Sequence, residues 1–196
     1  MFSKIICQIH SHTFQKVKQL LLNQSSNNIL RNETILQDDI SIILLISEII
    51  QNKDIQQVLS TLGKEYHLSA VISNIIKAQS GEYYFHIDYP YSNKLEAIQL
   101  LIPFQNIDYN NGCTIFMNDK EELYPLELSI NNNQNENIIN IEIGWWESRI
   151  KHSSGINKSN EDRIAIVVNF VSNHIEPRNN IADMLSSYNN LESIID

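Results

Sequence analysis

Apolar residues recur at helical spacing in the first third of the chain. In residues 12–22 they fall at Phe14, Val17, Leu20 and Leu21, which form one face of a helix. Three helices are therefore predicted, over residues 12–22, 40–51 and 53–62. Asp38 or Asp39 could cap the second helix, and Gly63 ends the third. Apolar residues surround the axis of the second helix, so we expect it to be well buried.

Beyond these helices the apolar pattern changes from helical spacing to alternation and short apolar runs. Six strands are predicted, over residues 67–78, 82–91, 95–104, 113–117, 138–143 and 164–171. The composition of residues 108–112 and the glycine at Gly144 predict turns. Residues 181–195 return to helical spacing. Helices, then short strands, then a helix indicate a mainly β (α+β) protein with a jelly-roll core.

The chain has 196 residues, 42% of them hydrophobic, which fits one globular domain over residues 1–196. Within it we expect a mostly helical buttress (1–65), a jelly-roll core (66–171) and a C-terminal helix (172–196). The net charge of −9 argues against extended nucleic-acid binding or an anionic membrane surface. A small anionic ligand is still compatible with it, because a local cation can outweigh the global field.

The lengths of the apolar runs and the number of cysteines bear on cellular location. No apolar run approaches the roughly 18 residues that a membrane span needs. The apolar part of residues 1–7 is too short for a signal peptide. The two cysteines, Cys7 and Cys113, give no disulfide framework, so a reducing compartment and a cytoplasmic location are expected. The oligomeric state is left open.

The stretch 82–91 carries the first candidate chemistry. In a strand, residues two apart point to the same face, so His86 and Asp88 would project side by side. An imidazole and a carboxylate are two thirds of the 2-His-1-carboxylate ligand set of non-heme Fe(II) oxygenases. Roughly one His-x-Asp/Glu pair is expected by chance in such a chain. The third ligand would have to come from a distant histidine, and His152 is a candidate.

The segment that follows His152 supplies the second half of the candidate site. A polar loop leads from His152 to Arg163, which opens an apolar strand where a charge is costly unless paired. Adjacent strand residues face opposite sides, so Asp162 is a poor partner for Arg163. A guanidinium can hold a carboxylate through two parallel hydrogen bonds, so a bound dicarboxylate would meet this need.

Four elements in this order resemble the Fe(II)/2-oxoglutarate-dependent dioxygenases, and most closely their phytanoyl-CoA dioxygenase-like branch. They are His86-Ile87-Asp88-Tyr89, then Asn110-Asn111-Gly112-Cys113, then His152-Ser153-Ser154-Gly155-Ile156-Asn157-Lys158-Ser159, then Arg163 eleven positions after His152. The resemblance covers roughly residues 58–171. The branch usually has Pro-Gly-Ser-His soon after the Asn-Gly turn, where this chain has Phe116-Met117-Asn118-Asp119-Lys120.

The resemblance implies a double-stranded β-helix of the jelly-roll or cupin-like kind. It also implies Fe(II) on His86, Asp88 and His152, with 2-oxoglutarate held by Arg163 and Ser154. The family uses O2 to oxidise a substrate and releases succinate and CO2. Related halogenases lack the carboxylate ligand, so Asp88 favours hydroxylation, here of a small molecule whose identity is left open.

Other interpretations of the same residues stay open at this stage. The two histidines could be a hydrogen-bonded pair in a strand core, Arg163 could form a structural salt bridge, and Ser154 could cap the backbone. At the level of function, the chain could be a jelly-roll binding protein without turnover, since a fold does not fix an activity. It could also be a cupin-type metalloenzyme that does not use 2-oxoglutarate.

Overall fold

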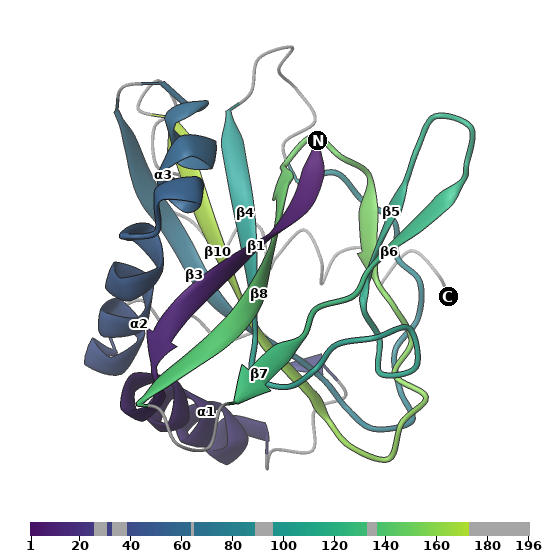
Figure 1. The fold of residues 1–196 in the computed structure, drawn as a ribbon. Helices are drawn as coiled ribbons and strands as arrows, with labels where there is room; N and C mark the ends of the chain where they lie inside the picture. Colours follow the sequence, from purple (N-terminus) through teal and green to yellow (C-terminus); the bar gives the residue numbers. More distant parts are fainter. Residues whose placement is uncertain (26–30, 33–38, 64, 89–95, 133–136, 173–196) are drawn as a thin grey trace.

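Two antiparallel β-sheets form the centre of the computed structural model, which describes residues 1–25, 31–32, 39–63, 65–88, 96–132 and 137–172. The larger sheet follows the order β1-β8-β4-β10-β3-β2, with β7 paired to β8, and the smaller follows β6-β5-β9. The larger sheet comprises β1 (Phe2–His10), β2 (Arg31–Asn32), β3 (Tyr66–Ile76), β4 (Ala97–Pro103), β7 (Ile130–Asn132), β8 (Ile138–Glu147) and β10 (Arg163–Ser172). The smaller comprises β5 (Thr114–Met117), β6 (Leu123–Leu126) and β9 (His152–Ser154). This is the predicted α+β architecture with a jelly-roll core (Figure 1).

The larger sheet has a different core on each of its faces, which β10 illustrates. Ile164, Ile166 and Val168 belong to the large apolar cluster that also contains the buried residues of the helices. Ala165, which alternates with them, belongs to a smaller cluster with Leu126 and other side chains of the smaller sheet. Strand alternation therefore separates a helix-covered face from a face that looks into the barrel.

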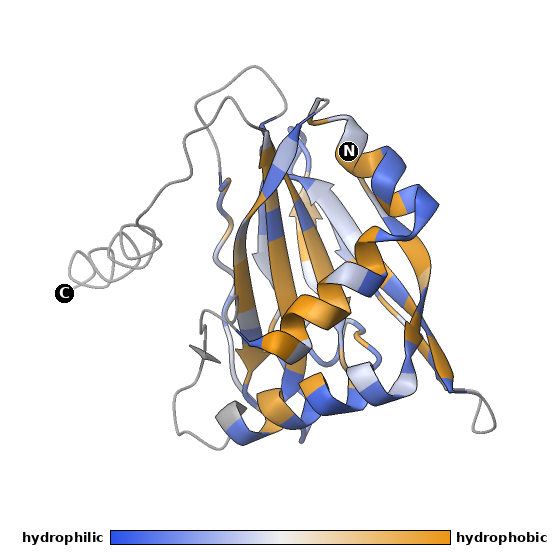
Figure 2. Cartoon of the chain, turned by 90° about the vertical axis from the view of Figure 1, so that its left-hand side faces the viewer, coloured by the Kyte–Doolittle hydropathy of each residue, from blue (hydrophilic) through white to orange (hydrophobic). Residues whose placement is uncertain are grey.

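The three helices cover one face of the larger sheet (Figure 2). Their buried apolar residues join the large apolar cluster on that face. They are α1 (Ser11–Ser25), α2 (Ile40–Ile50) and α3 (Lys53–Ser60), close to the predicted ranges. The Asp39 side chain caps α2 by accepting hydrogen bonds from the backbone N–H groups of Ser41 and Ile42. Gly63 follows α3 at φ +118°, a conformation that glycine adopts without strain.

The prediction that α2 is well buried is wrong for one side of the helix. Ile42, Leu45, Ile46 and Ile49 are buried, but the opposite side of the helix is open. Ile40, Ile43 and Leu44 are 68%, 48% and 51% exposed. The apolar pattern of α2 therefore predicted more burial than the structure has, because α2 contacts the rest of the fold along one side only.

The N-terminal strand β1 was not predicted. It pairs with β8 along its whole length, from Phe2 opposite Trp146 to His10 opposite Ile138. Ile5, Cys7 and Ile9 alternate and are buried, which is the period of a strand with one covered face. The short strands β2, β6, β7 and β9 were also not predicted.

The predicted turn at Gly144 is wrong, because β8 runs straight through this residue to Glu147. Gly144 pairs with Lys4 on one side and Leu101 on the other. A Cβ at this position would lie 2.4 Å from Leu126 Cδ2 of the smaller sheet. Gly144 is thus needed for the close approach of the two sheets.

The predicted strand 82–91 is also wrong over its described part, residues 82–88. This segment makes one isolated bridge, at His86, and is not a regular strand. The Tyr84 N–H donates to the Ser153 hydroxyl at 2.8 Å in place of a backbone carbonyl, which interrupts the ladder. The predicted helix 181–195 lies outside the described residues. Within the part of the chain that the structure describes, no helix is long and apolar enough to span a membrane.

Replacing Gly144 with alanine should destabilise the fold by about 1–3 kcal/mol, because the new methyl group overpacks against Leu126. Urea unfolding of wild type, Gly144→Ala, Leu126→Ala and the double variant measures this cost and its origin. We expect the double variant to be more stable than the sum of the single changes implies. Additive single changes would contradict the proposed contact between the two sheets.

Candidate metal centre

A pair of backbone hydrogen bonds brings the two candidate histidines together. The His86 N–H donates to the His152 carbonyl at 2.9 Å, and the His152 N–H donates to the His86 carbonyl at 3.0 Å. This antiparallel bridge joins the segment 82–88 to β9 and extends the smaller sheet by one more chain segment. The imidazole ring centroids lie 4.6 Å apart as a result.

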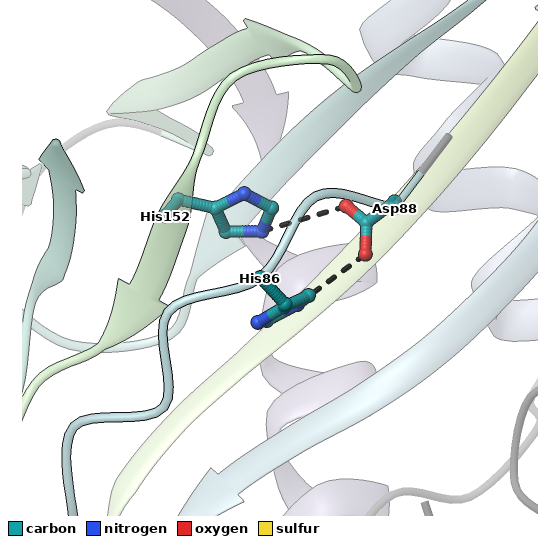
Figure 3. Close-up of side chains that lie close together, drawn as sticks. All are labelled: His86, Asp88 and His152. Atoms are coloured by element: carbon teal, nitrogen blue, oxygen red, sulfur yellow. Dashed lines mark ion pairs between the residues drawn. The ribbon is translucent and has the colours of Figure 1, made fainter. Parts of the chain in front are cut away.

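Asp88 completes the group, two residues along the chain from His86. Its N–H donates to the Ser148 carbonyl at 3.2 Å, which fixes the backbone beside the end of β8. Its carboxylate oxygens lie 3.3 Å from His86 Nε2 and 3.5 Å from His152 Nε2 (Figure 3). One donor atom from each of the three side chains lies within 4.8 Å of the others, so the group could hold a metal ion.

The orientation of both rings is set by backbone carbonyls. His86 Nδ1 lies 3.0 Å from the Tyr84 carbonyl, and His152 Nδ1 lies 2.8 Å from the Ile150 carbonyl. A carbonyl oxygen accepts only, so each Nδ1 must carry the proton, and a neutral ring then turns the lone pair of Nε2 toward Asp88. Two lone pairs facing a carboxylate require a cation between them, either a proton or a metal ion. The donor set therefore fits a divalent transition metal.

The carboxyl group of Asp88 is charged in this setting. Burial acts to raise the pKa of Asp88, since it disfavours the charged form. When protons are the cations between the rings and the carboxylate, the hydrogen bond from His86, the positive charges of His152 and His86, and the Gln99 side chain outweigh burial, so the pKa of Asp88 is lowered below its usual range. An ionised carboxylate is the form that binds a metal.

Arg163 is buried at the start of β10, with 1% of its surface exposed. Its guanidinium donates a hydrogen bond to the side chain of Asn74 on the neighbouring strand β3. Asp162 faces elsewhere, as predicted, because it bonds the Lys77 ammonium and the Ala78 N–H, both at 2.9 Å. The charge of Arg163 also acts on Cys113, although burial prevails and raises the pKa of that thiol to about 11. The guanidinium thus lies inside the barrel, near Asn74 and Cys113.

Ser154 ends β9, directly opposite Thr114 of β5, and is half-buried. Its carbonyl accepts a hydrogen bond from the Ser153 hydroxyl at 2.9 Å. Its role toward a cosubstrate stays a prediction. Trp146 is 2% exposed and packs against His152, with ring centroids 5.2 Å apart.

Sequence reasoning missed the part that Asn157 plays between His152 and Arg163. Asn157 is fully buried, and its Nδ2 donates to the carbonyls of Ile76 at 3.1 Å and Glu161 at 2.8 Å. Its Oδ1 accepts from the N–H and the hydroxyl of Ser159. Asn157 therefore holds the loop that carries the chain from one candidate functional residue to the other. The Asn-x-Ser element of the motif was the available signal.

Comparison with known proteins identifies the fold. No family model and no curated protein sequence matches the chain. The non-heme monooxygenase ThoJ, in complex with nickel, superposes with a TM-score of 0.65 over 90% of this chain and 75% of its own, at 14% identity. HygX from Streptomyces hygroscopicus, with nickel and 2-oxoglutarate bound, gives 0.63 over 90% and 84%, at 8% identity.

SnoN, a non-heme alpha-ketoglutarate-dependent epimerase from nogalamycin biosynthesis, gives a TM-score of 0.54 over 86% of this chain and 77% of its own, at 11% identity. At identities this low the likeness concerns the fold. The chain therefore has the jelly-roll fold of the non-heme oxygenases, and the group of His86, Asp88 and His152 lies within it.

Replacing Asn157 with alanine should destabilise the protein by at least about 2 kcal/mol, because two carbonyls in the interior lose their donor. Thermal or urea unfolding measures the loss. Asn160→Ala is the matched control on the same loop, since Asn160 is exposed and its change should stay within about 0.5 kcal/mol. Equal stability of the two variants would show that Asn157 does not hold the loop.

Proposed function

We propose that the chain is an Fe(II)- and 2-oxoglutarate-dependent oxygenase acting on a small molecule. The observation that carries the proposal is the meeting of His86, Asp88 and His152 in one group, with a buried arginine inside the same barrel. The fold supports it, because HygX and ThoJ share the fold and are described with bound metal.

In this proposal the three side chains bind Fe(II) from one side and leave its remaining positions to ligands. With 2-oxoglutarate and O2 bound, the iron supplies the oxidising chemistry, which releases succinate and CO2. The barrel contributes orientation: the carbonyls of Tyr84 and Ile150 fix the imidazoles, and the buried surroundings of Asp88 keep water from its carboxylate.

Arg163 would bind the distal carboxylate of 2-oxoglutarate, and Ser154 would assist. The guanidinium has the planar fork that matches a carboxylate, and Asn74 holds it on one side. Because Arg163 is fixed at the start of a central strand, the anchor is rigid. A dianionic cosubstrate would also bring negative charge to a buried cation, which lowers the cost of burying it.

The type of oxidation we favour is hydroxylation. SnoN shares the fold and is described as an epimerase, whereas ThoJ is described as a monooxygenase, so the fold serves both reactions. The metal group retains the carboxylate of Asp88, which occupies the position that a halide would need. The phytanoyl-CoA dioxygenase-like branch stays a prediction from the motif order.

Succinate release that depends on 2-oxoglutarate distinguishes the proposed function from two others. A binding protein without turnover would release no succinate, and a cupin-type enzyme of another kind would turn over without consuming 2-oxoglutarate. The buried Arg163 supports the 2-oxoglutarate enzyme, since its guanidinium inside the barrel can bind the distal carboxylate of that cosubstrate.

The purified protein should bind one equivalent of Fe(II) and slowly convert 2-oxoglutarate to succinate without added substrate. Asp88→Ala should abolish both, since the variant removes one of three ligands. Anaerobic Fe(II) titration and chromatographic detection of succinate are the measurements. The exposed Asp119→Ala is the control and should behave as wild type. Full succinate release by Asp88→Ala would refute the assignment of the ligand.

Arg163→Lys should weaken 2-oxoglutarate binding by roughly ten- to a hundredfold, which corresponds to about 1.5–3 kcal/mol for a charge-assisted hydrogen bond. The change keeps the charge and loses the planar fork. Arg163→Ala should nearly eliminate binding. Anaerobic titration of 2-oxoglutarate into the Fe(II)-loaded protein, followed by its visible charge-transfer absorption, measures the affinity.

Iron binding by both Arg163 variants serves as the internal control, because the guanidinium is not part of the metal group. If Arg163→Ala binds iron and also binds 2-oxoglutarate as tightly as wild type, the anchor lies at another residue.

A further inference from the structure

Gln99 is the one polar residue of strand β4. Every residue of β4 is buried, and the other six are alanine, isoleucine, leucine and proline. Gln99 is 4% exposed and lies next to Leu100, which belongs to the large apolar core. An amide in such a strand has to be desolvated when the chain folds, so its presence calls for an explanation.

The contact of Gln99 supplies that explanation. The backbone brings Asp88 to this part of β4, because the Asp88 N–H donates to the Ser148 carbonyl and the Ser148 N–H donates to the Ala97 carbonyl, two residues before Gln99. From there the Gln99 side chain lowers the pKa of Asp88 as a hydrogen-bond partner of its carboxylate. A carboxylate only accepts hydrogen bonds, so the amide NH2 of Gln99 must face Asp88 and the amide oxygen must point away. Besides the two imidazoles, Gln99 is thus a further group that acts on this carboxylate.

The amide oxygen of Gln99 does not stabilise the fold. Gln99 Oε1 is buried and has no hydrogen-bond partner among the described residues. A buried acceptor without a partner destabilises the folded chain, and an apolar side chain of the same length would avoid that cost. Gln99 therefore fits its contact with Asp88 better than it fits the core.

The neighbours of Gln99 link it to the second histidine. Gln99 lies directly opposite Trp146 on β8 and Asn169 on β10. Trp146 packs against the imidazole of His152. One row across three strands therefore backs the metal group, with Gln99 behind the carboxylate and Trp146 behind one imidazole.

We propose that Gln99 is a positioning residue, which donates a hydrogen bond to Asp88 and holds the carboxylate in the orientation that binds the metal. The inference rests on the proposed metal site and goes beyond it, because it concerns a residue that does not touch the metal. Partners of this kind orient a ligand whose free rotation would otherwise weaken binding. An unrestrained carboxylate would rotate between the two imidazoles and the metal.

Gln99→Met tests the proposal, because methionine keeps the length of the side chain and removes the donor. Gln99→Asn is a second variant, which keeps the amide but is too short to reach Asp88. Asn169→Leu is the matched control: it also replaces a buried amide whose oxygen has no hydrogen-bond partner among the described residues, in the same row. The probe is Co(II), whose visible absorption reports the ligand geometry, with calorimetry for affinity.

Both Gln99 variants should bind Co(II) about ten- to a hundredfold more weakly than wild type, with altered visible absorption. Asn169→Leu should keep the affinity and absorption of wild type. The melting temperatures of the metal-free proteins show whether Gln99→Met and Asn169→Leu perturb the core to a similar degree, and a variant that does not fold is replaced by the other.

Wild-type Co(II) affinity and absorption in a folded Gln99 variant would overturn the proposal. Equal weakening in Asn169→Leu would also overturn it, because the loss would then come from the core in general. Failure of the wild-type protein to bind Co(II) would instead refute the metal site on which the proposed function depends, so the two failures are distinguishable.

Discussion

Two backbone hydrogen bonds, between His86 and His152, are the interaction on which the candidate site depends. They join positions 66 residues apart in the chain (152 − 86). Once the bridge forms, the imidazoles are neighbours, and the carbonyls of Tyr84 and Ile150 orient both rings. Asp88 is placed beside them because its own N–H donates to the carbonyl of Ser148. The geometry of the metal group is therefore largely a property of the backbone, and the side chains add the donor atoms.

The elements that could be predicted from the sequence are those whose environment is uniform along their length. The strand 164–171 is apolar except at Asn169, because helices cover one of its faces and the smaller sheet covers the other. The segment 82–88 could not be predicted in the same way. Its aromatic residues favour a strand, but β9 offers only three residues to pair with, and the Ser153 hydroxyl takes one of the N–H groups. Tertiary contacts decided its conformation.

For the candidate site, residue types and spacing selected His86, Asp88 and His152, which the structure brings together in a group that could hold a metal ion. The role of Arg163 as a carboxylate anchor stays a proposal. Supporting residues gave a weaker signal. Asn157 stands in a loop rich in Asn and Ser, where composition cannot separate an amide with four hydrogen bonds from an exposed one. Gln99 stands in an apolar strand, and only the structure shows that its side chain meets Asp88. Their roles depend on contacts between distant segments, which spacing does not encode.

The two faces of the larger sheet carry different kinds of residue: apolar core residues on one face and the polar residues near the candidate site on the other. The core beneath the helices consists of apolar side chains from α1, α2, α3 and the strands. Arg163, Asn74, Gln99 and Asn169 alternate with those core residues along their strands and so lie on the opposite face, inside the barrel. Polar groups in a barrel interior cost stability, and the apolar face offsets that cost without contacting them. Because strand periodicity keeps the two sets apart, the inner face can change its chemistry while the helix-covered core stays the same. ThoJ, HygX and SnoN each share the fold with this chain at 8–14% identity to it, which such a separation allows.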